Sequence, residues 1–144
     1  MSTTNRISVR DLPDICMAYW HLLAAGWMLF VRRTAIETWL EHWNGRLVRR
    51  PVSPQENREA MRAARWSNTA ARYPFPWARC LQRSVALCMW LEKKGLAPEL
   101  RVGVRKDRGT VAAHAWVEFN GRVLNDGQHV KTVFGAFDTR SLGK

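Results

Sequence analysis

The order of expected elements in the second half of the chain constrains its fold more than any other feature. Leu81, Val85 and Cys88 follow helical spacing and predict a helix over about residues 77–93. Three later segments alternate polar and apolar residues as strands do, over residues 99–106, 111–120 and 122–126. Turn-forming residues separate these strands, so we expect the helix to lie against a small antiparallel sheet.

The first half of the chain is predicted to be mainly helical. Residues 15–31 form an apolar run, and residues 34–43 continue as helix. Ser53-Pro54-Gln55-Glu56 is a capping box with proline at the first helical position, and it opens a helix that should end near Arg72.

The size of the chain indicates one domain. Its 144 residues contain 47% hydrophobic residues and no repeats, which is enough to bury one core. We therefore predict a single α+β domain over residues 1–144. A helical N-terminal half (1–72) packs on a small antiparallel sheet, and residues 73–144 hold the Cys80 helix and the strands.

Cys80, His114 and Asp126 lie on these elements in an order that suits nucleophilic catalysis. Cys80 lies near the start of its helix, where the helix dipole favours a thiolate anion. The thiolate can attack a carbonyl, the imidazole can take and return the proton, and the carboxylate can fix the imidazole tautomer. The alternative for His114 is an ordinary polar residue of an amphipathic strand. His129 could compete as the base, but it has no comparable strand context.

The register of the last hairpin decides whether His114 and Asp126 can meet. A two-residue loop, Asn120-Gly121, would turn Asp126 to the other face of the sheet unless a bulge intervened. A three-residue loop over 119–121 would set His114 opposite Asp126, because cross-strand partners share a face. It would also pair two opposite charges across the hairpin. We therefore predict the three-residue loop, with Gly121 at positive φ.

Four short motifs carry a resemblance to a known family over about a third of the chain. They are Cys80-Leu81-Gln82-Arg83-Ser84, residues 99–105, His114-Ala115-Trp116-Val117-Glu118, and Asn125-Asp126. Their order, spacing and flanking residues together resemble the lasso-peptide leader peptidases. These are transglutaminase-like cysteine proteases of bacterial peptide-maturation clusters. The helical first half, rich in Trp and Arg, is also typical of that family but less diagnostic.

This resemblance implies a papain- or transglutaminase-like core in which Cys80, His114 and Asp126 form the catalytic triad. We also expect Trp77, Arg83 and Trp116 to contact the substrate. The implied substrate is a ribosomally made precursor peptide whose leader is removed, with no cofactor. Longer members carry a winged-helix leader-recognition domain, which the residues before Cys80 do not resemble. The implied partners are therefore a separate leader-recognition protein and an ATP-dependent lasso cyclase.

Two alternatives to a protease remain open. A transglutaminase-like acyltransferase would use the same triad and pass the acyl group to an amine. A non-enzymatic, basic peptide-binding module would need no triad. The net charge of +11 suggests an electropositive surface that attracts an acidic peptide, a protein partner or nucleic acid. We expect no nucleic-acid partner, because the chain contains no recognised nucleic-acid motif.

Cysteine usage predicts a cytoplasmic protein without a structural metal. Cys16, Cys80 and Cys88 are an odd number without regular spacing, which argues against a disulfide framework and favours reduced thiols. No pair of cysteines or histidines has the spacing of a zinc finger, so we expect no metal site.

The apolar run over residues 15–31 should pack against the core of the domain, a partner protein or a membrane surface. It is shorter than the ~20 residues that span a membrane, and His21 lies near its middle. We expect a buried helix or a docking helix, and attachment to a membrane surface ahead of a true span. Eight tryptophans are many for this length, and those of the first half serve either the core or a docking surface.

Overall fold

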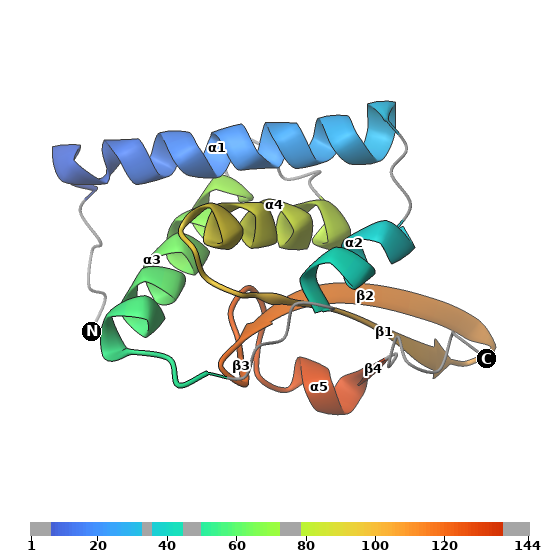
Figure 1. Ribbon diagram of the computed structural model, residues 1–144. Coiled ribbons are helices and arrows are strands. Elements are labelled where there is room, and N and C mark those ends of the chain that lie inside the picture. The colour runs from blue at the N-terminus through green and yellow to red at the C-terminus, as the bar shows by residue number, and fades with distance from the viewer. Residues whose placement is uncertain (1–6, 33–35, 45–49, 73–78, 137–144) are drawn as a thin grey trace.

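The structure is a computed structural model, and it describes residues 7–32, 36–44, 50–72 and 79–136. Its first part is helical (Figure 1), with η1 (Val9–Asp11), α1 (Leu12–Gly26), the π-helical η2 (Trp27–Val31), α2 (Ile36–Asn44) and α3 (Pro54–Ala70). Its second part holds α4 (Cys80–Lys93), β1 (Glu99–Asp107), β2 (Thr110–Phe119), β3 (Arg122–Val123), α5 (Val130–Val133) and β4 (Gly135–Ala136).

Helix α4 lies at the centre of the molecule, between α1 on one side and the sheet on the other (Figure 1). Its Val85, Leu87, Cys88 and Leu91 are completely buried. The main hydrophobic core joins these residues to side chains of α1, α2, α3 and the first two strands. The predicted α+β class, helices packed with a small antiparallel sheet, is confirmed.

The helix boundaries follow local sequence signals. The predicted capping box is present, because the Ser53 hydroxyl accepts the Glu56 N–H (3.2 Å) and the Glu56 carboxylate accepts the Ser53 N–H (2.8 Å). Helix α4 begins at Cys80, later than the predicted start at 77. Trp77 lies outside the described residues.

The sheet has the strand order β3-β2-β1-β4, and every pair is antiparallel. β1 pairs with β2 along its whole length, and the two are joined by Arg108-Gly109, both at positive φ. β4, which pairs with β1, has no counterpart in the strands predicted from the sequence.

The predicted three-residue loop between β2 and β3 is wrong. Phe119 pairs with Arg122, so the loop is Asn120-Gly121. Both loop residues have positive φ, 50° and 74° respectively. This combination is typical of a type I′ turn, whose twist matches that of the flanking strands. The preference of Asn-Gly for this turn therefore outweighs the charge pair of Glu118 with Arg122 that the longer loop would have formed.

Glu118 takes its positive partners from other elements. Its carboxylate lies 3.4 Å from Lys131 Nζ, which belongs to α5, and 3.8 Å from Arg101 Nε on β1. It also accepts a hydrogen bond from Trp116 Nε1 at 2.9 Å. Burial of this carboxylate is thus compensated without Arg122, and the two-residue register leaves no unpaired buried charge at Glu118.

Gly121→Val should destabilise the protein by about 1–2 kcal/mol, because a β-branched residue resists a left-handed backbone. A Cβ at position 121 would meet nothing within 4 Å, so the cost would come from backbone conformation and not from a clash. Urea unfolding measures the change. Asn120→Gly, which also permits positive φ, is the control and should be nearly neutral. Equal stability of Gly121→Val and the wild type would contradict the type I′ turn.

Candidate active site

Cys80 is the first residue of α4, so its thiol lies at the helix N-terminus. The preceding residue, Arg79, has an extended backbone (φ −70°, ψ 159°). The Cys80 side chain is partly exposed. Backbone N–H groups in a first helical turn have no intrahelical acceptor, and together with the helix dipole they favour an anion. The position suits a thiolate, and the Cys80 N–H suits a developing oxyanion.

The other two cysteines lie in settings that do not suit a nucleophile. Burial, with a smaller contribution from the negative charge of Glu92, raises the pKa of the Cys88 thiol well above its ordinary value. That thiol therefore stays protonated in the core. Cys16 is exposed on α1, away from the helix start. Cys80 is the cysteine that combines access to solvent with a helix N-terminus.

His114 and Asp126 are joined by a hydrogen bond between Nε2 of the imidazole and Oδ2 of the carboxylate. His114 lies in β2 and Asp126 in the segment after β3. Both side chains are partly exposed. Because Nε2 is bound to the carboxylate, Nδ1 is the ring nitrogen that remains for a thiol. The predicted pairing of these two residues is therefore present, although the predicted register is not.

The chain achieves this pairing by leaving the β ladder after Val123. The N–H of Leu124 still bonds to the carbonyl of Val117 (2.9 Å), but the N–H of Val117 donates to the side-chain Oδ1 of Asn125 (2.8 Å). A side-chain amide thus replaces the next backbone acceptor. The backbone can therefore turn after Val123. In a regular strand Asp126 would point to the face opposite His114, and the turn removes this constraint.

Asn125 also ties this segment to the nucleophile helix. Its Nδ2 donates to the hydroxyl of Ser84 at 2.9 Å, and Ser84 is a completely buried residue one turn after Cys80. One side chain therefore connects β2, α4 and the Asp126 segment. Gln128 secures the segment from the other end, because its amide bonds both the N–H (3.2 Å) and the carbonyl (2.8 Å) of Val123.

The surroundings of Asp126 favour its ionised form. Partial burial acts to raise its pKa, but hydrogen bonds from His114 and from the Gly127 N–H (2.7 Å) act in the opposite direction. Positive charge on His114 and His129 adds to them, and the net effect lowers the pKa of Asp126. The carboxylate can therefore hold a protonated imidazole. His129 acts on Asp126 through its charge.

The floor under the imidazole is apolar. The ring of Phe134 stacks on His114 at 5.0 Å between centroids. Gly103 on β1 faces His114 across the sheet, and a Cβ there would lie 2.8 Å from Phe134 and 2.9 Å from Trp116. The glycine is needed for this close approach. An isolated glycine in an expected strand signals such an approach, whereas nothing in the sequence marks Phe134 as a neighbour of His114.

Trp116 does not fit its predicted contact with substrate. It is completely buried, and its Nε1 donates to Glu118. It forms a second hydrophobic cluster with Val123 and Val130, against which Phe134 packs. Trp116 therefore supports the His114 side of the sheet from within.

Arg83 lines a cavity of about 380 Å³ that adjoins Asp126. The other lining residues are Asn68, Arg72, Asn125, Asp126 and Gly127. The Nε of Arg83 is buried and has no hydrogen-bond partner within the described part of the chain. Arg83 as a lining residue gives the cavity a positive charge, which suits a carbonyl or carboxylate oxygen. This location is compatible with the predicted substrate contact of Arg83.

No hydrogen bond joins Cys80 to His114 among the described residues. Val117 and Phe119 of β2 belong to the core with α4, so His114 and Trp116 point to the opposite face of the sheet. The imidazole and Asp126 meet beside the edge of β2, beyond the short β3. A proton transfer from Cys80 to His114 therefore requires a closer approach of these two side chains. Catalytic hydrogen bonds are often long in the absence of substrate and shorten when substrate binds.

Two further features bear on the chemistry. Gln82, two residues after Cys80, donates its Nε2 to the carbonyl of Leu22 on α1 (2.9 Å), so it is unavailable to an oxyanion. Within the described residues, no three His, Cys, Asp or Glu side chains come together in a group that could hold a metal ion.

Residues 24–137 match the model of the transglutaminase-like superfamily. The match covers most of the chain, and the chain belongs to this superfamily. Domains of this kind commonly form the cores of cysteine proteases or acyltransferases. A search of curated proteins and a search of solved structures each found no match.

Asn125→Ala should destabilise the protein by about 1–3 kcal/mol, because it leaves the Val117 N–H and the buried Ser84 hydroxyl without their partner. Ser84→Ala is the matched control. It removes the same Ser84 contact but keeps the Asn125 bond to β2, so its effect should be smaller. Thermal or urea unfolding compares them. Equal losses in the two variants would contradict the role of Asn125 as the replacement acceptor of the ladder.

The His114–Asp126 pair should make stability depend on pH in acid. A carboxyl whose pKa is lowered by folding stabilises the folded state above its unfolded pKa of about 3.9, and the contribution is lost as pH falls through the lower folded value. The free energies of unfolding of the wild type and of Asp126→Asn should therefore differ at neutral pH, begin to converge as pH falls below about 4, and coincide only below the lower folded pKa of Asp126. A difference that stays constant across the pH series would contradict the lowered pKa of Asp126.

Proposed function

We propose that this chain is a cysteine peptidase that removes the leader from a ribosomally made lasso-peptide precursor. The hydrogen-bonded pair of His114 and Asp126, in a transglutaminase-like chain with Cys80 at a helix N-terminus, carries the proposal. The motif from Cys80 to Ser84 and the pair Asn125-Asp126 add the resemblance to leader peptidases. The side chains of Cys80, His114 and Asp126 are all partly exposed, which leaves access for a peptide.

The proposed mechanism gives each of the three side chains its own role. As the peptide binds, the Cys80 thiol passes its proton to Nδ1 of His114, and the sulfur attacks the scissile carbonyl. The N–H of Cys80 stabilises the oxyanion. The imidazolium returns the proton to the leaving amine, and a thioester remains on Cys80. His114 then activates water, which releases the leader and restores the thiol. Asp126 keeps Nε2 protonated and balances the imidazolium charge throughout.

The proposed partners follow from the resemblance and from charge. A separate leader-recognition protein would deliver the precursor, and an ATP-dependent cyclase would consume the product. The net charge of +11 would favour acidic segments of either partner or of the leader. Arg83 and its cavity beside Asp126 lie where a peptide carbonyl or carboxylate near the scissile bond could bind.

Cys80→Ala should reduce cleavage of the precursor by on the order of 10³-fold or more, because the nucleophile is lost. Cys16→Ala is the matched control, since Cys16 is an exposed cysteine outside the site. Cys88→Ala should also retain most activity. The assay follows the shortened peptide by mass spectrometry, with circular dichroism to show that each variant is folded. Full activity of Cys80→Ala would end the protease proposal.

The same assay separates a protease from an acyltransferase. Both would form a thioester on Cys80, but hydrolysis gives a shortened peptide, whereas transfer to an amine gives an isopeptide or an acylated amine. We expect the hydrolytic product. If an acylated amine were the main product, the function would be acyl transfer by the same three residues and not leader removal.

A separate leader-binding protein should accelerate cleavage strongly, because bringing the scissile bond to the thiol raises its effective concentration. The test compares initial rates for this chain alone and with the partner, using Cys80→Ala with the partner as the control for contaminating peptidases. Equal rates with and without the partner would mean that the helical first half recognises the leader itself.

A further inference from the structure

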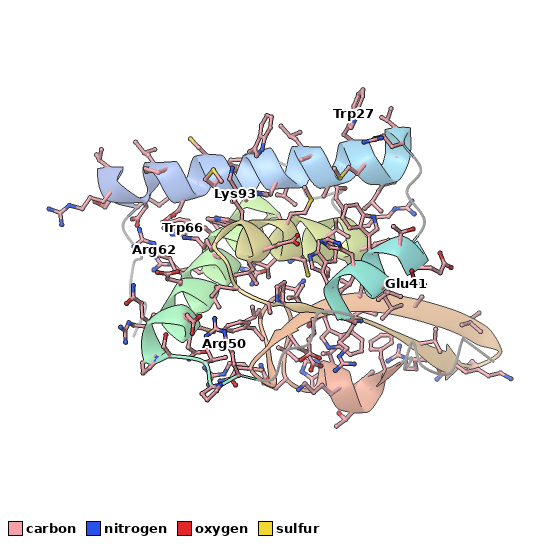
Figure 2. All side chains as sticks on the ribbon, viewed as in Figure 1. Trp27, Glu41, Arg50, Arg62, Trp66 and Lys93 are labelled. Atoms are coloured by element: carbon pink, nitrogen blue, oxygen red, sulfur yellow. The ribbon has the colours of Figure 1, made fainter. Side chains whose placement is uncertain are left out.

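The outer face of α1 and η2 carries a continuous stripe of exposed apolar side chains. Each member of this stripe is at least half exposed, and the members are separated by mainly three or four residues, so they lie along one side of the helix. They are Val9 (80%), Leu12 (50%), Trp20 (63%), Leu23 (56%), Trp27 (61%), Phe30 (60%) and Val31 (56%). Figure 2 shows Trp27 pointing away from the rest of the molecule. We call this set the outer stripe.

The opposite face of the same helix is fully used in the core. Ala18, Leu22 and Ala25 are buried, and α1 packs on α3 and α4. Gln82 of α4 donates to the carbonyl of Leu22, and the imidazole of His21 bonds to the carbonyl of Met17 at 2.7 Å. The helix Val9–Val31 is long and apolar enough to cross a membrane. Spanning would break these contacts with α3 and α4, whereas lying flat would keep them.

The charges around the outer stripe suit an anionic surface. The acids of this helix, Asp11 and Asp14, are both bound by Arg62 of α3, with Nη2 3.7 Å from Asp11 and Nε 2.5 Å from Asp14. Exposed Arg10 and Arg32 lie near the two ends of the stripe. The whole chain carries +11.

We propose that the outer stripe docks flat on the surface of an anionic lipid bilayer. The outer stripe consists of apolar side chains without charge, so it can form few of the hydrogen bonds that protein interfaces usually contain. An apolar helix face of this kind suits the boundary between lipid headgroups and acyl chains. Trp and Phe are side chains that favour the level of the lipid headgroups. Basic residues beside such a helix add attraction to anionic lipid.

This docking would leave the His114–Asp126 pair accessible. In Figure 1, α1 lies on one side of α4 and the sheet lies on the other. A bilayer against α1 would therefore cover neither β2, which carries His114, nor the segment with Asp126. The inference rests on the outer stripe and on charge, and it does not depend on the proposed function.

Co-sedimentation with vesicles tests the proposal directly. The full chain should pellet with vesicles of equal parts phosphatidylglycerol and phosphatidylcholine, and far less with phosphatidylcholine alone. In about 1 M salt, where the Debye length falls to about 3 Å, binding should weaken. The double variant Trp20→Glu/Trp27→Glu should lower partitioning by on the order of tenfold or more, because it places charge in the apolar face.

Val111→Glu is the control, because Val111 is also strongly exposed (70%) but belongs to β2, on the other side of α4. It should bind vesicles like the wild type, and circular dichroism should show that both variants are folded. A wild type that remains in the supernatant with anionic vesicles would overturn the proposal. So would a stripe variant that binds as well as Val111→Glu. A wild-type dimer that ignores vesicles and dissociates in the stripe variant would assign the stripe to a second copy instead.

Discussion

The two hydrogen bonds of the Asn125 side chain hold together the parts of the candidate site. Asn125 replaces a backbone acceptor for Val117 on β2 and simultaneously binds Ser84 on α4. These bonds end the ladder, turn the chain, and set Asp126 against His114. They also link that pair to the helix that begins with Cys80. A buried polar bridge of this kind is costly if any member is lost, so the geometry of the site depends on it.

Periodicity predicts the longer helices and strands, because each of them has one face that must be buried. It does not predict the short α5 and β4. The capping box at Ser53 and the helix after Cys80 both depend on local signals and were found. The pairing of β4 with β1 was not predicted, because a strand of two residues, Gly135–Ala136, has no period to detect. The tryptophans of the first half divide between the core and the surface. Trp43 and Trp66 are buried, whereas Trp20 and Trp27 are exposed.

The pairing of His114 with Asp126 was predicted from the wrong hairpin register. Side chains alternate between the two faces of a regular strand, so the pairing required a three-residue loop. The structure instead has a two-residue turn, Asn120-Gly121. His114 and Asp126 still meet, because a side chain can substitute for a strand at one rung of the ladder. Neither that substitution nor the burial of Trp116 can be read from spacing, since both depend on packing against α4 and α5.

We propose that Cys80 and His114 act together, although no hydrogen bond joins them in the described part of the chain. The most direct measurement is the rate of alkylation of Cys80 by iodoacetamide near pH 7, resolved by peptide mass spectrometry, in the wild type and in His114→Ala. We expect Cys80 to react faster than Cys16 and Cys88 in the wild type. His114→Ala should slow the alkylation of Cys80 and leave Cys16 unchanged, because the proposed transfer of the thiol proton to His114 promotes the thiolate. An identical rate at Cys80 in the two proteins would contradict this proposal.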